Sequence, residues 1–281
     1  MTGTPSGVTD AVVRVGPRTA LDGVSLTAEP GAVTAVVGGD GAGKTTLLRV
    51  LVGRVALDAG TRTAPDPHRI GFAPATAGSW AGLTVEQNLA FVGGSYGVDA
   101  PILRERTEQL LEAAGLREFR DRPAAQLSGG MRRKLGAILA MVHDPQLLVL
   151  DEPSTGVDPV SRVDLWRLAA HAAARGTTVV MSTSYLDEAE RAAHVLVLDA
   201  GRPLAQGLPA AVVGAFPGTL TEQERPVRPA WAWRRGRRFR ELWPPGGPPS
   251  GAPVGALAEA DLEDVVMARS LLALHGEVEA P

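Results

Sequence analysis

Apolar residues recur along the chain in two patterns that predict strands of different burial. Residues 8–15 and 21–29 mix apolar and polar positions, as half-buried strands do, whereas residues 32–38 form a nearly continuous apolar run. Such a run is typical of a strand buried in a parallel sheet. Further buried strands are predicted at 147–150, 177–182 and 195–198, with helices at 159–174 and 186–193. This alternation predicts an α/β fold with a parallel core.

Between residues 76 and 140 the pattern changes from strands to helices. Helical segments are predicted at 84–94, 101–116 and 129–143. This stretch therefore predicts a helical insert within the α/β core.

The composition changes again from residue 217 onward. Eight prolines, seven arginines and three of the five tryptophans fall between residues 217 and 253. Residues 231–243 favour a short hairpin that turns at Gly236, although the same arginines also fit a solvated face. Residues 260–274 predict a final helix. We therefore expect residues 217–281 to form a small C-terminal appendage to a main domain at 8–216.

Composition narrows the chemistry that these elements can support. The 281 residues carry a net charge of −3, which gives no general attraction to nucleic acid, so we expect no nucleic-acid partner. The absence of cysteine excludes disulfides, cysteine-ligated zinc and thiol catalysis. The N-terminus does not resemble a signal peptide, and no segment reaches the roughly 20 apolar residues needed to span a bilayer. We expect any membrane role to be exerted through a partner.

Only two of the 28 basic residues are lysines, and one of them lies in a glycine-rich loop. Residues 38–45, GGDGAGKT, fit the pattern G-x-x-x-x-G-K-[ST] directly after an apolar strand. Backbone N–H groups of such a loop close around phosphate oxygens, so Lys44 would neutralise the β- and γ-phosphates and Thr45 would bind Mg²⁺. The predicted nucleotide-binding residues are Gly38, Gly39, Asp40, Gly41, Ala42, Gly43, Lys44, Thr45 and Thr46. The alternative is a glycine-rich turn that caps an ordinary helix.

Two carboxylates directly follow the apolar strand at 147–150. Asp151 is predicted to hold Mg²⁺ together with Thr45, and Glu152 is predicted to polarise the attacking water as general base. An acidic pair after a strand is, by itself, usually a solvated loop or a helix cap. The phosphate loop upstream favours the functional interpretation.

A third motif, LSGGM at 127–131, distinguishes between families of phosphate-loop proteins. Taken alone, Ser128 is a good helix cap. Because it lies between the other two motifs, the segment resembles the signature of ATP-binding cassette (ABC) proteins. This resemblance disfavours a phosphate-loop kinase. The residues that carry this resemblance are Leu127, Ser128, Gly129, Gly130 and Met131, followed by Thr155, Gly156, Val157 and Asp158 at the place of the family's D-loop.

The resemblance covers about residues 8–216 and implies the fold and assembly. The fold is that of an ABC-type P-loop NTPase, with a mixed or parallel sheet core and a helical subdomain at about 76–140. Two cassettes pair head to tail, so that the signature of one grips the γ-phosphate of a nucleotide held by the other. ATP-driven closure and later opening of this pair would drive a permease.

Three positions depart from the family's pattern. Val15 stands where an aromatic residue usually stacks on adenine, Ala75 where a glutamine senses Mg²⁺ and water, and Ser184 where a histidine contacts the γ-phosphate. Lys44, Thr45, Asp151 and Glu152 are nevertheless intact. We expect a degenerate site that binds ATP and hydrolyses it slowly or not at all, while the intact signature completes the site of a partner.

Further details resemble the ATPase subunits of ABC-2-type multidrug exporters. GGDGAGKTT, TGVDP and STSYLDEAE are similar to the first cassette of subunits that carry two cassettes. The resemblance implies Mg²⁺ and ATP as cofactors, transmembrane permease subunits as partners, a second cassette paired as a heterodimer rather than a homodimer, and a cytoplasmic location at the inner face of the cell membrane. The alternative is a non-transport nucleotide sensor or assembly factor. Neighbouring reading frames for multi-spanning proteins and a second cassette would favour export.

Overall fold

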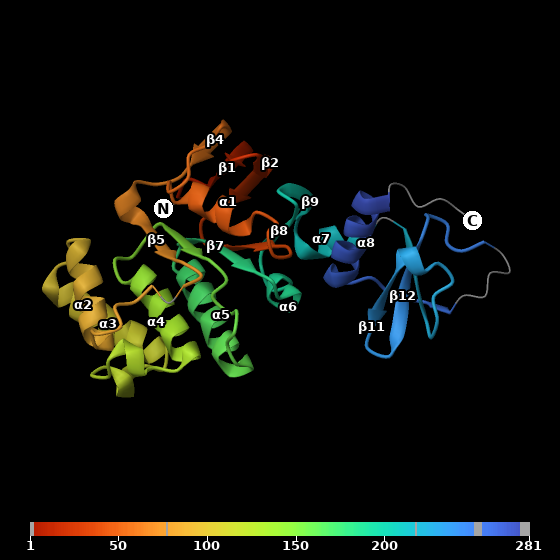
Figure 1. The fold of residues 1–281 in the computed structure, drawn as a ribbon. Coiled ribbons are helices and arrows are strands. Elements are labelled where there is room, and N and C mark those ends of the chain that lie inside the picture. Colours follow the sequence, from red (N-terminus) through yellow and green to blue (C-terminus); the bar gives the residue numbers. More distant parts are fainter. Residues whose placement is uncertain (1–2, 77, 217, 250–254, 276–281) are drawn as a thin grey trace. The chain divides into compact units, whose positions relative to one another are not determined.

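The computed structural model describes residues 3–76, 78–216, 218–249 and 255–275 (Figure 1). The chain divides into two compact units, Met1–Pro203 and Leu204–Pro281. This division lies earlier than the predicted boundary at 216/217, because α7 (Pro209–Gly214) packs on α8 (Leu262–His275) within the second unit. Residue 77 of the predicted helical insert and residues 217, 250–254 and 276–281 of the predicted appendage lie outside the described residues.

A central six-stranded sheet has the strand order β5-β6-β7-β3-β8-β9. Its strands are β3 (Val33–Val37), β5 (Ile70–Ala73), β6 (Leu147–Leu150), β7 (Thr178–Thr183), β8 (His194–Asp199) and β9 (Arg202–Gly207). β3 pairs in parallel with β7 and β8, and β6 pairs in parallel with β5 and β7. Every residue of β3, β6 and β7 is buried, which explains their apolar runs. The predicted parallel α/β core is confirmed.

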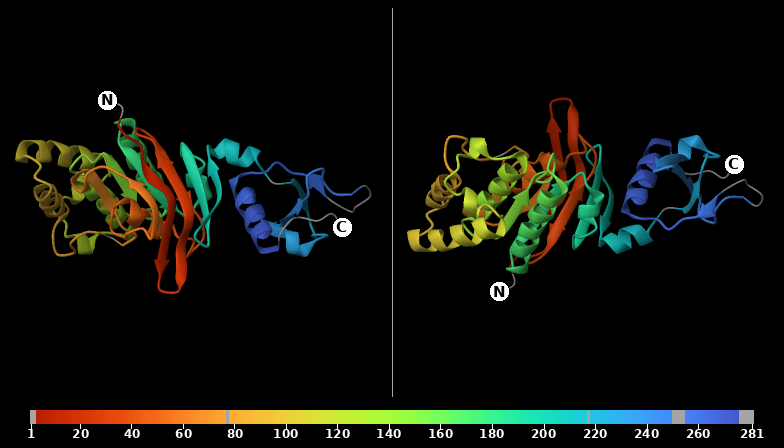
Figure 2. Two further views of the ribbon diagram at one scale, coloured as in Figure 1. Left: turned by 90° about the horizontal axis from the view of Figure 1, so that it is seen from above. Right: turned by 90° about the horizontal axis from the view of Figure 1, so that it is seen from below.

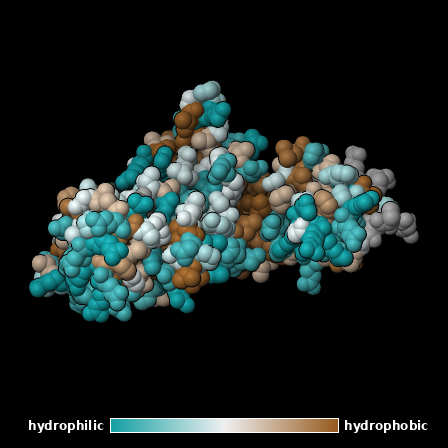
Figure 3. All heavy atoms as spheres, turned by 60° about the horizontal axis from the view of Figure 1, so that its bottom comes forward, coloured by the Kyte–Doolittle hydropathy of each residue, from teal (hydrophilic) through white to brown (hydrophobic). Residues whose placement is uncertain are grey.

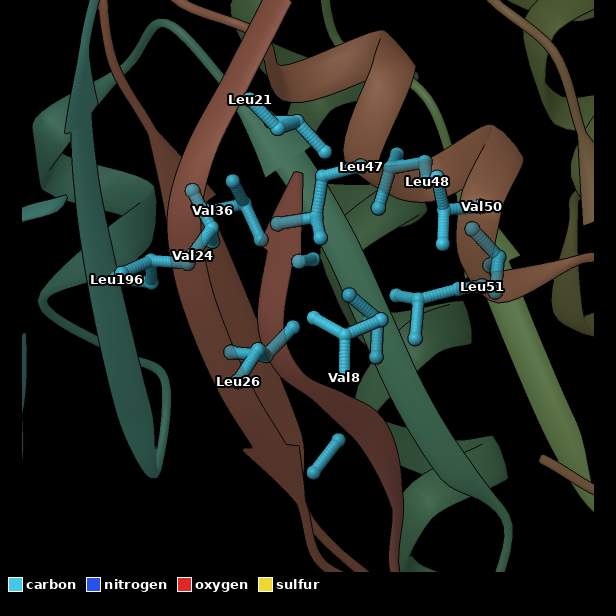
Figure 4. Close-up of a cluster of buried hydrophobic side chains, with 14 of the residues drawn as sticks. Val8, Leu21, Val24, Leu26, Val36, Leu47, Leu48, Val50, Leu51 and Leu196 are labelled. Carbon is cyan, nitrogen blue, oxygen red and sulfur yellow. The ribbon is translucent and has the colours of Figure 1, made fainter. Parts of the chain in front are cut away.

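A second, antiparallel sheet has the strand order β2-β1-β4. Its strands are β1 (Ser6–Val15), β2 (Arg18–Ala28) and β4 (Ala59–Thr63). Side chains from β1, β2, β3 and β8 pack against α1 (Lys44–Leu51) in the main core, where Leu21, Leu47 and Leu196 are fully buried (Figure 4). The sequence did not predict β4, because all five of its residues are exposed and carry no apolar alternation.

The predicted helical insert is confirmed as α2 (Val85–Ser95), α3 (Ala100–Ala113) and α4 (Gly129–Met141). These helices gather at one end of the first unit in both views of Figure 2. α5 (Pro159–Ala174) matches its prediction, but α6 (Leu186–Ala189) ends before the predicted residue 193. After the helix, the N–H groups of Arg191 and Ala192 donate three residues back instead of four, and the Ala193 N–H donates to the carbonyl of Val33 in β3 (2.9 Å).

Among the residues that the structure describes, none of the helices combines the length and the apolar character of a membrane-spanning segment. On the face drawn in Figure 3, hydrophilic residues cover most of the end formed by α2–α4.

The second unit contains a four-stranded sheet with the order β11-β12-β10-β13. The strands are β10 (Thr219–Gln223), β11 (Ala232–Arg235), β12 (Arg238–Trp243) and β13 (Ala256–Leu257). β11 and β12 pair as the predicted hairpin, in which Arg235 faces Arg238 and Gly236 adopts a left-handed φ of 60°. α8 confirms the predicted final helix and contributes Ala268 to a small core with Leu220 and Leu242.

Candidate nucleotide-binding site

The phosphate loop connects buried β3 to the first turn of α1. Gly38 lies against β8, since a Cβ at this position would come within 2.3 Å of the Leu198 carbonyl oxygen. Gly43 precedes the helix with a left-handed φ of 104°, and a Cβ there would come within 2.7 Å of the Ala20 carbonyl oxygen. Only glycine satisfies both positions, so the close approach of the backbone fixes the loop.

Lys44 lies at the start of α1 with its side chain only 6% exposed. Its Nζ donates to the carbonyl oxygens of Gly38 (2.6 Å) and Gly39 (3.1 Å), and it lies 3.0 Å from Glu152 Oε1. The loop and one carboxylate therefore hold the ammonium group beside a pocket lined by Ala20, Gly39–Thr46 and Glu152. A phosphate oxygen is the kind of ligand that this cation attracts.

The predicted metal ligands lie side by side at the ends of α1 and β6. Thr45 Oγ1 donates to Asp151 Oδ1 over 3.1 Å. Ser182, on the neighbouring strand β7, donates to the same oxygen (2.8 Å) and orients the nearly fully buried carboxylate. A hydroxyl and a carboxylate are oxygen ligands of the kind that Mg²⁺ prefers, so these residues fit the ion.

Glu152 is held by three side chains. Its Oε2 accepts from Thr155 Oγ1 (2.7 Å), and its Oε1 accepts from Ser184 Oγ (2.8 Å) and faces Lys44. Burial alone would raise the pKa of the Glu152 carboxyl, but hydrogen bonds from Thr155, Lys44 and Ser184, together with the charge of Lys44, lower it below its usual value. Glu152 is therefore a stabilised carboxylate and a weak proton acceptor.

The three departures from the family's pattern occupy different surroundings. Ser184 is part of the cluster, because it also lies 3.4 Å from Lys44 Nζ. Val15 lies at the end of β1 with 62% of its surface exposed. Ala75 follows β5, and its carbonyl oxygen accepts from Arg133 of α4.

The signature forms the beginning of α4. Ser128 caps this helix by accepting from the Met131 N–H (3.2 Å). Gly130 packs against the first turn of α5, since a Cβ there would come within 2.8 Å of Ser161 Oγ. Asp158, the last predicted D-loop residue, caps α5 through the N–H groups of Val160 and Ser161, and these bonds lower its pKa. Signature and D-loop segments therefore meet at α5.

The described lining of the phosphate-loop pocket includes no residue of this signature segment. The structure thus separates the sequence motifs into two groups. Lys44, Thr45, Asp151, Glu152 and Ser184 form one cluster, and residues 127–131 and 158 form the other. Sequence reasoning missed Ser182, whose only signal is a polar residue at the end of an apolar strand.

Comparison with known proteins identifies the family. The sequence profile of the ABC transporter family matches residues 21–155. Nod factor export ATP-binding protein I of Paraburkholderia xenovorans (strain LB400) is 38% identical over 211 residues, which cover 71% of this chain and 69% of that protein. The chain belongs to the ABC transporter family. The predicted family and its α/β cassette fold are therefore confirmed.

Other relatives agree with this assignment. The probable multidrug ABC transporter ATP-binding protein YbhF of Escherichia coli (strain K12) is 39% identical over 211 residues, which cover 72% of this ABC chain but only 36% of that protein. Among solved structures, an ATP-binding subunit of an ABC transporter superposes with a TM-score of 0.70 at 25% identity, covering 76% of this chain and 93% of that one. A nucleotide-free cassette gives a TM-score of 0.62 at 26% identity, covering 73% and 91%.

Proposed function

We propose that the chain is the ATP-binding subunit of an ABC-2-type export system and acts with transmembrane permease subunits at the inner face of the cell membrane. The proposal is supported by the names of its relatives, which include a Nod factor export ATP-binding protein and a probable multidrug ABC transporter ATP-binding protein. The permease, rather than this chain, would bind the exported compound.

ATP would bind with its phosphates on the loop formed by Gly38–Thr46. Lys44 would exchange its carbonyl and carboxylate partners for phosphate oxygens, and Thr45 and Asp151 would hold Mg²⁺. When bound, Mg²⁺ would neutralise charge on the β- and γ-phosphates. Asp40 and Thr46 would complete the cradle through their positions in the loop and first helical turn.

The cluster around Glu152 is the observation that carries the second part of the proposal, slow hydrolysis at this site. Glu152 is the carboxylate predicted to activate water, and after Lys44 turns to the phosphates the hydroxyls of Thr155 and Ser184 would still donate to it and favour its ionised form. Ser184 lies in the cluster but carries no imidazole charge, and Ala75 has no side-chain hydrogen-bonding group. Val15 offers no aromatic face to adenine.

The signature would serve a different nucleotide from the one on this chain's own loop. Residues 127–131 are intact but are not part of the described lining of the phosphate-loop pocket. We infer that they complete the site of a second, fuller cassette in a head-to-tail heterodimer. Such a pair would contain one active and one weak composite site.

A titration of the purified chain with Mg·ATP tests the nucleotide site. We expect Lys44→Ala to weaken binding at least tenfold, since a charge-assisted bond contributes about 1.5–3 kcal/mol and about 1.4 kcal/mol corresponds to tenfold. Arg49→Ala is the matched control, because Arg49 is an exposed cation on the same helix α1. Equal dissociation constants for Lys44→Ala and wild type would exclude the proposed phosphate contact.

A further inference from the structure

The segment after β7 carries Ser184 into the nucleotide site and is folded around one buried carboxylate. Glu188 is 2% exposed, and its Oε2 accepts from Thr183 Oγ1 over 2.7 Å. Thr183 Oγ1 in turn accepts from the Tyr185 N–H (3.0 Å). Ser184 lies between Thr183 and Tyr185, so these bonds tie the backbone on both sides of Ser184 to Glu188.

Arg162, from the first turn of α5, holds this segment at three points. Its Nε donates to Glu188 Oε1 (3.1 Å), and its terminal nitrogen donates to Asp187 at 3.0 and 3.1 Å. The guanidinium carbon lies 3.7 Å from the centre of the Tyr185 ring. A planar guanidinium can form such a fork and stack at the same time, which a lysine cannot.

The first turn of α5 also contacts α4, the helix that begins with the signature. Gly130 packs directly on Ser161, the residue before Arg162. One turn along, Lys134 of α4 pairs with Asp164 of α5 at 3.1 Å, and the lysine side chain is only 10% exposed. α4 and α5 are therefore joined at two points, and a displacement of α5 moves the signature.

We propose that Arg162 is a positioning residue that couples Ser184, in this chain's own nucleotide site, to the signature that serves the partner cassette. The path runs from Ser184 through its neighbour Thr183 to Glu188 and Arg162 on α5, and from α5 to Gly130. A nucleotide on the phosphate loop rearranges Lys44, Glu152 and Ser184, and Arg162 transmits that change to α4. This inference rests on the proposed binding of ATP, and it gives a weakly hydrolysing site a regulatory use.

Amide hydrogen exchange of the full chain, with and without Mg·ATP, tests the coupling. In the wild type, ATP should slow exchange in residues 127–133 by at least about fivefold, the lower end of the range for coupled sites. In Arg162→Ala, the dissociation constant for ATP should stay within about threefold of the wild-type value. The slowing of exchange that ATP causes in residues 127–133 should fall below about twofold. Arg167→Ala is the control, because Arg167 is an exposed arginine on the same helix.

A second variant separates a loss of coupling from a loss of folding. Arg162→Ala leaves the buried Glu188 carboxylate without its arginine, whereas Arg162→Gln/Glu188→Gln removes both charges and leaves no unpaired buried ion. We expect the double variant to lose the response as well. If the double variant still binds ATP and its exchange still slows as in the wild type, Arg162 does not couple the two sites, although the proposed function would stand. No ATP binding by the wild type would overturn the proposed function and the coupling together.

Discussion

The Glu152 carboxylate determines the chemical character of the site. It accepts hydrogen bonds from Thr155 and Ser184 and pairs with Lys44, so that it is strongly stabilised in the ionised form. A general base is most effective when its pKa lies near the operating pH, and these partners move the pKa of Glu152 in the opposite direction. On the proposed function, these side chains would retain the charges that bind ATP while disfavouring proton transfer to Glu152.

The lowered pKa of Glu152 predicts a pH-dependent contribution to stability. The ionised form is favoured in the folded chain, so the contribution is present above the usual pKa of 4.5 and is lost as the pH falls through the lower folded value. We expect Glu152→Gln to destabilise the cassette by about 1.5–3 kcal/mol at pH 7, the range for hydrogen bonds to a charged group. This difference should shrink in thermal unfolding measurements below about pH 4. A difference independent of pH, or one matched by exposed Glu190→Gln, would contradict the assignment.

Val15 gives a second prediction at the scale of one residue. Its side chain is 62% exposed at the end of β1, where an aromatic ring would have room. We expect Val15→Tyr to tighten ATP binding about fivefold, because aromatic stacking contributes about 1 kcal/mol. Val15→Leu adds apolar volume without an aromatic face and is the control. Equal affinities of the two variants would show that adenine does not bind at β1.

At the scale of elements, the first turn of α5 joins the signature helix to the rest of the cassette. Gly130→Ala should destabilise the fold by about 1–3 kcal/mol, the usual cost of overpacking, because the new Cβ would lie 2.8 Å from Ser161 Oγ and 3.1 Å from its Cβ. Gly129→Ala is a matched control, since no atom lies within 4 Å of a Cβ at that position. Equal melting temperatures for the two variants would contradict close packing of α4 on α5.

The sequence predicted these elements where one signal dominated the local pattern. Continuous apolar runs predicted β3, β6 and β7, and the fixed spacing of GGDGAGKT predicted the phosphate loop. β4 was missed because its pairing with β1 uses backbone groups and exposed polar residues. Arg162 and Ser182 were missed because their partners lie 26 and 31 residues away, at Glu188 and Asp151, and no local pattern reports such contacts.

At the scale of the whole molecule, the nucleotide site and the signature differ in how closely they follow the family's sequence pattern. Ser184, Ala75 and Val15 depart from the family's pattern, and of these Ser184 lies in the nucleotide cluster, whereas residues 127–131 keep the pattern. A homodimer would combine two weak sites, while a heterodimer would let the intact signature act on a complete one. This difference is the reason to expect a fuller cassette as partner.

Slow hydrolysis at this site can be measured in a single turnover of prebound Mg·ATP, at a protein concentration that permits self-association. We expect a rate near background for the wild type and at least a tenfold gain for Ala75→Gln/Ser184→His, since positioned acid–base and polar groups contribute about 10²–10⁴-fold. Glu152→Gln should abolish that gain. Rapid hydrolysis by the wild type that is unaffected by Ala75→Gln/Ser184→His but lost in Glu152→Gln would show that the site is fully active, and it would favour a homodimer.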